Sequence, residues 1–586
     1  MEPSELGLVR KDADFSQSLN LTSISDAETV EDTYALKVGK KRAITYLANK
    51  KVFTFQNQDG LDFQIIFQVS NDGVAFRYFM PGDEEFKFIT EERTKFNLPD
   101  DARAWLQPCS EAKTGWARTN PSYEENYLMD ISVEESSPTN AGWVFPALFQ
   151  AKDQWVLLSE AGLDKNYCAS RLTSASPEGA YQIEFPQQAE NIFSGELLPQ
   201  STGDWYSPWR VIAVGSLKTI TESTLGTDVA LPAISGNFSW VEPGRAAWSW
   251  VILKDNSVNY ETQKQFIDYA ADMGWEYCLV DGLWDTQVGY DKIKELADYA
   301  ATKDVGLLLW YNSAGDWSEA YQTPKNVMLT RASRLAEFNK IHEMGIKGVK
   351  IDFFGGDGQS VIEYYHEILT DAAEAEIMVN FHGCTLPRGW QRTYPNLLTM
   401  ESIKGMEFIT FAQANADAAV AHCAMLPFTR NVFDPMDFTP VCFSEIPGVE
   451  RQTSNGFELA LSTLFISGLQ HYAETPEGMS EVPDYVKDAM KAVPVAWDES
   501  VFVDGFPGKY VVIARRSGTQ WFVAGINGEN QTKGLVLDFS FINSSKVTLI
   551  TDGTKERSWR QQAIELGDDG KFEVELKANG GFLVQM

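Results

Sequence analysis

The sequence lacks the short motifs that would assign its chemistry directly. It has no GxSxG elbow, no HExxH metal motif, no Walker phosphate loop, and no GxGxxG turn after its first buried strand. Its six cysteines include no CxxC pair, and their spacing fits neither a zinc ribbon nor a disulfide framework. We therefore expect free, mostly buried thiols, and the function has to be sought in other side chains.

Long apolar runs and long runs of one charge are also missing. No stretch of about 18 apolar residues occurs, so we expect no membrane span. The net charge of −33 argues against nucleic acid as a partner, because its phosphates would be repelled. The start, Met1-Glu-Pro-Ser-Glu5, has no basic or apolar region of a signal peptide. We expect a periplasmic or secreted protein if a signal was removed, and a cytoplasmic protein otherwise.

Aromatic residues, in contrast, are abundant. The chain has 17 Trp, 21 Tyr and 35 Phe, which exceeds what packing alone needs. Large β-sandwich cores account for most of them. A surplus is also typical of sugar sites, because ring faces stack on the apolar faces of pyranoses.

At 586 residues the chain is too long for one hydrophobic core, and its pattern divides into three parts. Residues 1–240 show period-two segments between turns, which predicts a large antiparallel β-sandwich. Residues 493–586 show the same alternation with Asn-Gly and Asp-Gly turns, which predicts a smaller antiparallel β domain, a C-terminal β-sandwich.

Residues 241–492 alternate apolar runs with amphipathic helices, the pattern of a (β/α)8 TIM barrel. A doubly wound sheet is the competing interpretation, but the missing GxGxxG turn disfavours it. Helices are predicted over 260–273, 290–303 and 330–344. The eight predicted strands are 247–251, 277–281, 306–311, 348–353, 377–382, 397–401, a weak one at 424–427, and 469–472.

The carboxyl ends of barrel strands converge on the active site, so the residues at those ends are the candidates for chemistry. Several polar or aromatic groups on one face are improbable by accident, although Asp281 alone could equally cap a helix. His382 more often positions a hydroxyl than binds a metal, because no partner histidine lies near it in sequence. The strand-end candidates are Trp250, Asp281, Trp310, Asn312, Asp352, His382, Glu401 and His471.

Two carboxylates stand out among these positions. Asp352 ends the apolar run Gly348–Phe353, and an unpaired buried acid there costs several kcal/mol. Period two places Lys350 on the same face, so a salt bridge between the two is the plainer interpretation. Glu407 closes the acidic cluster that begins at Glu401, and could instead be a solvated loop acid. Together, two carboxylates in one pocket can divide nucleophile and acid/base work, as sugar hydrolysis requires.

A longer block carries a resemblance to a known family. The run Pro387-Arg-Gly-Trp-Gln-Arg-Thr-Tyr-Pro-Asn396, leading to Glu401-Ser-Ile-Lys-Gly-Met-Glu407, resembles glycoside hydrolase family 97. Further matching segments are Ser207–Arg210, Leu426–Arg430, Pro435–Pro440 and Trp497–Glu499. The resemblance implies an N-terminal β-super-sandwich, a catalytic (β/α)8 barrel and a C-terminal β domain.

The resemblance also implies a stereochemical class. Inverting members carry a Glu directly after the strand-five histidine, whereas this chain has Gly383 there. Retaining members carry an Asp at the end of strand four, which is Asp352 here. By resemblance, Asp352 is the nucleophile and Glu407 the acid/base of a retaining, exo-acting α-galactosidase.

Calcium and substrate ligands follow from the same resemblance. The family's calcium is held by carboxylates, and the matching positions are Glu160, Glu401 and Glu407. A metal bond to Glu407 would lower the pKa of that acid and oppose its role as a proton donor. We expect calcium mainly to orient the site. The predicted substrate-binding residues are Asp281, Trp310, Asn312, Lys350 and His382.

Two other functions stay open. One is an α-glucosidase of the same family, since the residues that read the sugar 4-hydroxyl are not identified. The other is a catalytically silent carbohydrate-binding protein, which the presence of both Asp352 and Glu407 disfavours. The expected partner is an α-linked oligosaccharide, and the protein is expected to be a monomer or a small homo-oligomer.

Overall fold

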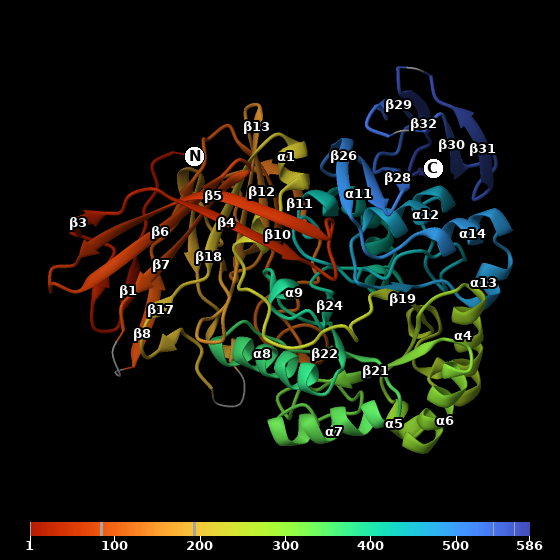
Figure 1. Cartoon of the computed structure of the whole chain (residues 1–586), viewed down its shortest axis with the longest axis horizontal. Coiled ribbons are helices and arrows are strands. Elements are labelled where there is room, and N and C mark those ends of the chain that lie inside the picture. The colour runs from red at the N-terminus through yellow and green to blue at the C-terminus, as the bar shows by residue number, and fades with distance from the viewer. Residues whose placement is uncertain (1, 83–85, 192–194, 543, 568) are drawn as a thin grey trace.

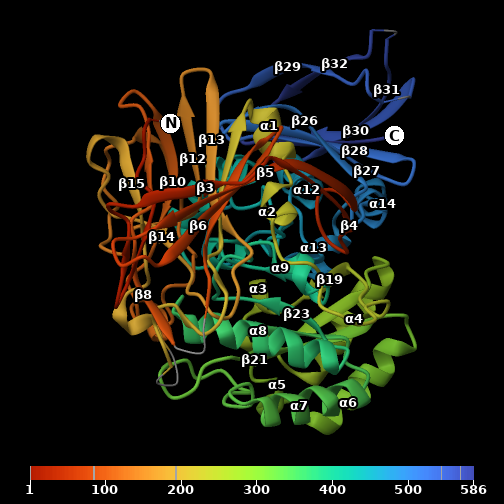
Figure 2. The same ribbon diagram turned by 60° about the vertical axis from the view of Figure 1, so that its left-hand side comes forward.

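The computed structural model describes residues 2–82, 86–191, 195–542, 544–567 and 569–586, so that Met1 lies outside the described residues. Three parts follow one another along the chain, coloured red to yellow, green and blue in Figure 1. A view turned by 60° shows the central barrel below the two β-rich parts (Figure 2). The predicted fold class, a β-sandwich, a barrel and a C-terminal β domain, is confirmed.

The N-terminal part consists of two antiparallel sheets. The larger follows the order β3-β5-β6-β7-β18-β13-β12-β14-β15-β9, with β4, β10, β11 and β17 paired beside this path. Its longest strands alternate outward polar with inward apolar residues, as the period-two pattern predicts. Its strands are β3 (Asn20–Ile24), β4 (Glu28–Ala35), β5 (Ala43–Gln56), β6 (Asp62–Ser70), β7 (Gly73–Met80), β9 (Lys95–Asn97), β10 (Arg103–Pro108), β11 (Leu128–Ser132), β12 (Trp143–Ala151), β13 (Gln154–Ala161), β14 (Arg171–Leu172), β15 (Ala180–Glu184), β17 (Trp205–Tyr206) and β18 (Trp209–Gly215). The smaller sheet holds β1 (Leu8–Arg10), β2 (Asp14–Phe15), β8 (Lys87–Glu92) and β16 (Gln200–Ser201).

The barrel is built from parallel strands in the order β24-β23-β22-β21-β20-β19-β25. Adjacent strands end in register, for example Asn312 beside Asp352, so that their carboxyl ends share one rim. The strands are β19 (Gly244–Trp248), β20 (Tyr277–Val280), β21 (Gly306–Asn312), β22 (Gly348–Asp352), β23 (Met378–Phe381), β24 (Leu397–Met400) and β25 (Leu469–Tyr472). The helices that surround them include α4 (Tyr260–Asp272), α6 (Tyr290–Ala301), α7 (Arg331–Glu343), α8 (Gln359–Glu374), α11 (Gln413–Met425) and α12 (Asn455–Leu464).

The predicted strand at 424–427 is wrong. These residues end α11 and enter a short 3-10 helix, Leu426–Phe428, because the alanine-rich run before them favours helix. An irregular segment lies between β24 and β25 instead: the amide of Asp437 donates to Met400 (3.0 Å) and that of Ala473 to Pro440 (3.2 Å). The two edges also meet directly: the amide of Gly468 donates to the carbonyl of Leu398 (3.1 Å), and the hydroxyl of Ser467 donates to that of Thr399 (3.0 Å).

The C-terminal part is a sheet in the order β26-β27-β28-β33-β30-β31 that packs on the pair β29-β32 through its own apolar core. Its strands are β26 (Glu499–Phe506), β27 (Tyr510–Ser517), β28 (Gln520–Asn527), β29 (Lys533–Asp538), β30 (Lys546–Asp552), β31 (Trp559–Glu565), β32 (Lys571–Leu576) and β33 (Gly581–Gln585). It also holds the barrel: Asp552 accepts from the amide of Gly456 (2.8 Å) and the hydroxyl of Ser454 (2.6 Å), at the start of α12.

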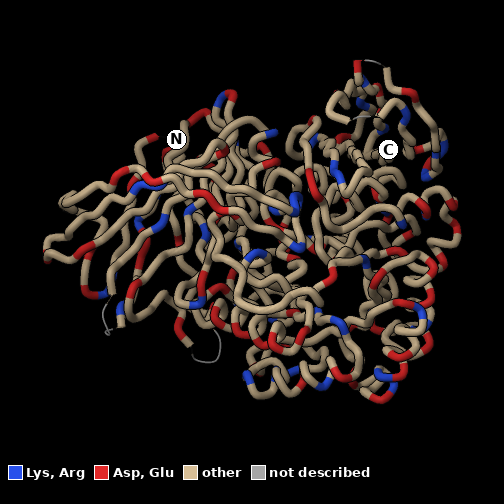
Figure 3. Tube along the Cα trace, in the orientation of Figure 1, with Lys and Arg blue, Asp and Glu red and all other residues tan. Residues whose placement is uncertain are grey.

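Three general expectations can be checked against this fold. All six cysteines are free and buried, as predicted. Acidic residues are scattered over all three parts rather than gathered in one patch (Figure 3). Within the described ranges, no helix has the length and apolar character that crossing a membrane requires.

Candidate active site

Asp352 ends β22 at the rim of the barrel, with Lys350 pointing to the same side of the strand. The ammonium of Lys350 lies 3.9 Å from Oδ2 of Asp352 and 3.5 Å from Oδ2 of Asp281. It also lies 3.9 Å from the ring centre of Trp248, whose Nε1 donates to Asp281 (2.8 Å). Burial lowers the pKa of Lys350, but the carboxylates of Asp281, Glu407 and Asp352 together raise it above its ordinary value. A buried cation therefore sits beneath the carboxylates of the rim.

The carboxylate of Asp352 is oriented by its neighbours. Nε1 of Trp310 donates to Oδ2 (3.3 Å), and the backbone carbonyl of Asp352 accepts from the amide of Ser313 (2.9 Å). Phe353 follows with a φ of 74°, a left-handed conformation that is rare for a bulky residue. Burial raises the pKa of Asp352 to about 6, although the charges of Lys350 and His382 favour its ionised form.

Glu407 comes from the short helix α10 (Met406–Ile409) and lines the same cavity as Asp352. That cavity has a volume of about 840 Å³. Burial raises the pKa of Glu407 to about 7; the charges of Glu401 and Asp352 add to this rise, while Lys350 opposes it. Near neutral pH, one of the two acids is thus mainly ionised while the other keeps a large protonated fraction. Such a pair can divide nucleophilic and proton-transfer roles.

Gly383 lies against Asp352 and leaves no room for a side chain. It adopts a φ of +48°, and a Cβ atom there would lie 2.8 Å from Oδ1 of Asp352 and 2.9 Å from the amide nitrogen of Phe353. Its own amide donates to Oε2 of Glu401 (3.0 Å), and its carbonyl accepts from the amide of Phe354 (3.0 Å). A carboxylate at 383 and the observed position of Asp352 therefore exclude each other sterically.

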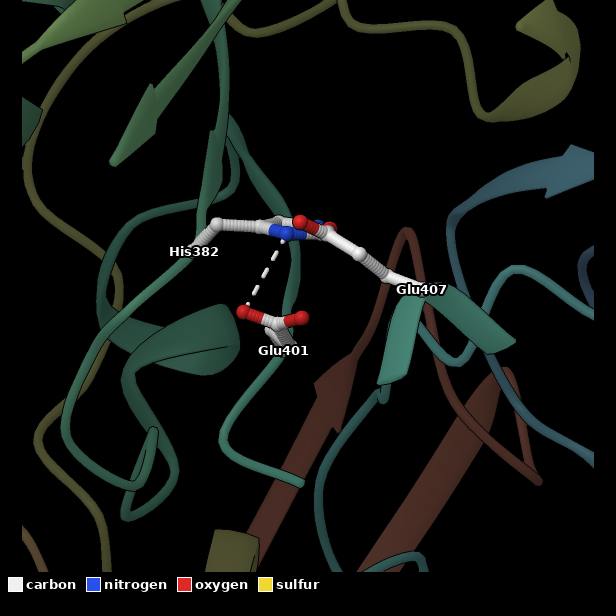
Figure 4. A group of neighbouring side chains, drawn as sticks. All are labelled: His382, Glu401 and Glu407. Carbon is white, nitrogen blue, oxygen red and sulfur yellow. Dashed lines mark ion pairs between the residues drawn. The ribbon is translucent and has the colours of Figure 1, made fainter. Parts of the chain in front are cut away.

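Asp437, on the irregular segment that replaces strand seven, anchors the far side of the rim. Its Oδ2 lies within hydrogen-bond distance of His382 (2.7 Å), His471 (2.9 Å) and Asn380 (2.6 Å). The other nitrogen of His382, Nδ1, lies 3.2 Å from Oε2 of Glu401, as the dashed line in Figure 4 marks. Burial lowers the pKa of His382, but Glu401 and Asp437 outweigh it and raise the pKa to about 10. His382 thus links two carboxylates as a cation.

With its imidazole neutral, His382 could instead join Glu401 and Glu407 in a group that holds a metal ion. Each offers a ligand atom, and these atoms lie within 4.8 Å of one another. In Figure 4 the Glu407 carboxylate reaches toward the imidazole, and Glu401 lies below both. Glu124 from the N-terminal part joins them: burial and a hydrogen bond to Glu401 raise the pKa of Glu124 well above its ordinary range. Three crowded carboxylates form a donor set of hard oxygens, which fits calcium.

Glu160, predicted as a metal ligand, lies outside this group, and its metal role stays a prediction. Its carboxylate forms buried ion pairs with Arg388 (2.6 Å) and with Arg210, and accepts from the hydroxyl of Ser170 (2.6 Å). Its charge is therefore already balanced by two guanidinium groups. Arg388 in turn donates to the hydroxyl of Tyr123 (3.1 Å), which lies next to Glu124 in the chain. Glu160 thus belongs to the interface that places Glu124.

The five residues predicted to bind substrate fall into two groups. Asp281, Trp310, Lys350 and His382 are buried directly behind the carboxylates, and their substrate roles stay predictions. Asn312 is different: its amide donates to the carbonyl of Gln322 (3.0 Å) and its oxygen accepts from the amide of Ala314 (2.8 Å). Both polar ends hold the loop after β21, so Asn312 anchors this loop, and its substrate role also stays a prediction.

Sequence reasoning missed Glu124, Asp437 and Trp248. Glu124 lies in a loop of the N-terminal part, where only the acidic pair Glu124-Glu125 gave a signal. Asp437 follows Pro435 on an irregular stretch without periodicity. Trp248 was passed over in favour of Trp250, because the apolar run continues across the end of β19 into helix α3 (Trp250–Leu253).

Comparisons with known proteins agree with this arrangement. Three family models match consecutive parts of the chain: the glycosyl-hydrolase 97 N-terminal model over residues 1–232, glycoside hydrolase 97 over 240–403, and the glycosyl-hydrolase 97 C-terminal, oligomerisation model over 496–586. The predicted domain limits at 240 and 492 stay predictions.

Relatives and one solved structure extend the likeness over the whole chain. A probable retaining alpha-galactosidase of Streptomyces bingchenggensis is 32% identical, covering 99% of this chain and 86% of the relative. A retaining alpha-galactosidase of Bacteroides thetaiotaomicron is 28% identical, with coverages of 90% and 83%. A crystal structure of a beta-arabinopyranosidase superposes with a TM-score of 0.97 at 37% identity, covering 100% of this chain and 94% of that one.

Proposed function

The chain belongs to glycoside hydrolase family 97, and from this premise we propose that it is a retaining, exo-acting α-galactosidase. One observation carries the stereochemical part. Asp352 and Glu407 line one cavity with unequally raised pKa values, and Gly383 leaves no space for a base between Asp352 and Glu401. The named activity of the two curated relatives supports the choice of sugar.

The first half-reaction forms a covalent intermediate. An oxygen of Asp352 attacks the anomeric carbon while the carbon–oxygen bond to the leaving group breaks, and Glu407 gives its proton to the departing oxygen. Lys350 and the indole of Trp310 hold Asp352 in its ionised, attacking form. The unequal pKa values supply one deprotonated and one protonated acid at the same pH.

The second half-reaction releases the sugar. Glu407, now a carboxylate, takes a proton from water as the water oxygen attacks the anomeric carbon and the ester bond to Asp352 breaks. Both displacements invert the anomeric centre, so the released sugar keeps its starting configuration. The positive charge of Lys350 lowers the pKa of both Asp352 and Glu407 and so favours the ionised form of each acid.

Calcium fits the carboxylate group at the edge of this site. Glu124 and Glu401 would hold it, with any bond to Glu407 weak because Glu407 has to keep its proton, and His382 would orient Glu401 through the contact at Nδ1. When bound, the ion supplies a fixed positive charge that orients sugar hydroxyl groups and neutralises the acidic cluster. Glu401 binds the amide of Gly383 as well, so the position of this carboxylate is linked to the backbone beside Asp352.

A second sugar is favoured by one observation, the 37% identity to a beta-arabinopyranosidase over the whole chain. β-L-Arabinopyranose has the ring configuration of α-D-galactopyranose but lacks the hydroxymethyl group. The same nucleophile and acid would serve either sugar. An α-glucoside differs instead in the direction of the 4-hydroxyl.

A panel of aryl glycosides tests the sugar, and a trapped intermediate tests the nucleophile. We expect turnover of the aryl α-D-galactoside or β-L-arabinopyranoside at a higher kcat/KM than of the α-D-glucoside. A preference for the glucoside would overturn the sugar assignment. A 5-fluoro-α-galactosyl fluoride should label a peptide that contains Asp352, seen by mass spectrometry. Label on another carboxylate would move the nucleophile elsewhere.

The description of the C-terminal family model as an oligomerisation domain favours a small homo-oligomer over a monomer. Light scattering coupled to size-exclusion chromatography measures this directly. A mass of one chain at micromolar concentration would contradict it.

A further inference from the structure

The helix that carries Glu407 is too short to be stable by itself. α10 has only four residues, Met406–Ile409, and no side chain caps its start. Contacts at its two ends hold it instead. The amide of Met406 donates to the carbonyl of Phe438 (2.9 Å), and the hydroxyl of Thr410 donates to the carbonyl of Glu407 (2.7 Å). The direction in which Glu407 points therefore depends on what holds Thr410.

Lys254 holds Thr410 from another loop of the barrel rim. Lys254 follows β19 and the short helix α3, whereas Thr410 follows β24 and α10. The ammonium of Lys254 donates to the hydroxyl of Thr410 (2.5 Å) and to the carbonyl of Val251 (2.8 Å). An ammonium can only donate, so the hydroxyl oxygen of Thr410 accepts this bond and its single proton goes to the carbonyl of Glu407. Two hydrogen bonds in series thus run from Lys254 to the backbone of Glu407.

The backbone of Lys254 gives these bonds a fixed starting point. Lys254 has a φ of 57°, a left-handed conformation that persists only where the surrounding structure enforces it. Its amide donates to the carbonyl of Trp250 (2.8 Å), and its carbonyl accepts from both the amide (2.9 Å) and the hydroxyl (2.8 Å) of Ser257. The side-chain amide of Gln263, on α4, donates to the carbonyl of Ser257 (2.9 Å). Lys254 is therefore anchored to a helix of the barrel.

The ammonium of Lys254 packs against neutral groups at the wall of the catalytic cavity. It lies 4.5 Å from the ring centres of both Trp250 and Phe411, and all three residues line the cavity. Burial lowers the pKa of Lys254 to about 8, and the charge of Glu407 is the largest that opposes this fall. At pH 7 the side chain is therefore mainly an ammonium, the form that donates to Thr410.

We propose that Lys254 is a positioning residue for the acid/base Glu407, which it holds in place through Thr410. The inference rests on the proposed function and adds one residue to its machinery. Fixing the end of α10 aims the carboxyl group of Glu407 at the departing oxygen, and a misplaced acid donates its proton more slowly. A leaving group that needs no proton does not depend on this aim. Lys254 and Thr410 thus act on proton transfer rather than on binding of the sugar.

The test compares a leaving group that needs a proton with one that does not. The first substrate is phenyl α-galactoside and the second α-galactosyl fluoride; if the aryl panel selects arabinopyranose, the corresponding arabinopyranosides take their place. We expect Lys254→Met and Thr410→Val each to lower kcat/KM for the phenyl glycoside about tenfold, the effect of one lost charge-assisted hydrogen bond, and that for the fluoride less than about twofold. Thr410→Ser, which keeps the hydroxyl, should stay close to the wild type on both substrates.

A double variant shows whether the two residues act in series. If Lys254 works through Thr410, the variant Lys254→Met/Thr410→Val should lose no more than either single variant, because the second change removes a bond that is already broken. The matched control is Thr302→Val. The hydroxyl of Thr302 caps the exposed end of α6 in the same way, donating to the carbonyl of Tyr299 (2.6 Å), and Thr302 does not line the catalytic cavity. We expect this variant to keep the wild-type kcat/KM.

The outcomes separate the two proposals. Equal losses on both substrates would overturn the positioning role, because they would place Lys254 in sugar binding or in the stability of the barrel. Additive losses in the double variant, or unchanged kinetics of Thr410→Val, would overturn it as well. If circular dichroism shows that Lys254→Met does not fold, the difference between Thr410→Val and Thr410→Ser decides. A wild-type enzyme that turns over neither galactosyl fluoride nor arabinopyranosyl fluoride would refute the proposed function itself, and the positioning role with it.

Discussion

Adding one methyl group at Gly383 should disable Asp352 although neither catalytic residue is itself replaced. In Gly383→Ala the new Cβ would lie 2.8 Å from Oδ1 of Asp352, about 0.6 Å closer than an ordinary contact. The new Cβ also meets the backbone, because the amide nitrogen of Phe353 lies only 2.9 Å away. The carboxylate of Asp352 therefore has to turn from its position beside Trp310 and Lys350.

The expected loss has a structural and a catalytic part. A residue with a Cβ at a φ of +48° costs about 1–2 kcal/mol, and the forced contact adds about 1–3 kcal/mol to the destabilisation. A nucleophile moved by a large fraction of an ångström loses up to about 100-fold in rate. We expect kcat on an aryl α-galactoside to fall between about tenfold and 100-fold, with a small change in KM.

A second glycine serves as the matched control. Gly274 has a φ of +63° and no atom within 4 Å of an added Cβ, so Gly274→Ala bears the backbone cost alone. Gly274→Ala should lower the Tm by a few degrees and leave kcat unchanged. Circular dichroism gives the Tm and verifies that each variant is folded. A Gly383→Ala enzyme with wild-type kcat would refute the steric reasoning. Gly383→Glu should be destabilised as well, and Asp352→Gly in the same chain should restore part of its Tm.

Four further predictions concern the acids and the metal. Asp352→Gly should abolish turnover, and added azide should restore it with formation of a β-galactosyl azide, whereas near wild-type activity without azide would place the nucleophile elsewhere. Glu407→Gln should lose about 10²- to 10⁴-fold on an α-galactosyl-(1→6)-glucose disaccharide but far less on α-galactosyl fluoride, whose leaving group needs no protonation, and equal losses would exclude it as the proton donor. The pH profile of kcat/KM should fall below pH about 6, where Asp352 becomes protonated, and above pH about 7, where Glu407 loses its proton. With α-galactosyl fluoride as substrate, the Glu407→Gln variant should lose the fall at high pH. If its kcat/KM still falls above pH about 7, the assignment of that limb to Glu407 is wrong. Calcium titrated by calorimetry into metal-free enzyme should bind at least about tenfold more weakly to Glu124→Gln than to the neighbouring control Glu125→Gln, and equal affinities would remove Glu124 from the site.

The pattern of the sequence predicts the parts of the fold that local periodicity determines. Strand β22 and its terminal Asp352 lie where the apolar run predicts them, because a parallel strand is buried on both faces and stops where its loop begins. The start of the barrel is less clear. The apolar run containing Trp248 continues into the helix that begins at Trp250, so periodicity alone does not place the end of β19.

Contacts between parts of the chain far apart in sequence are not contained in such patterns. Glu124 meets Glu401 only because the N-terminal sandwich packs over the barrel, and Tyr123 and Arg388 fix that packing. The pairing of Glu160 with Arg210 and Arg388 is likewise not visible in the sequence, because these three residues lie far apart in the chain. The segment around Asp437 has no periodicity, because Pro435 and Pro440 lack the amide hydrogens that a strand requires.

The central claim is that Asp352 and Glu407 act by double displacement with retention. Proton NMR of the first sugar released from an aryl α-galactoside tests this most directly, recorded before the free sugar mutarotates. The account predicts that α-galactose appears first and β-galactose only later, as mutarotation proceeds. If β-galactose appears first, a single displacement by water operates and the role given to Asp352 is wrong.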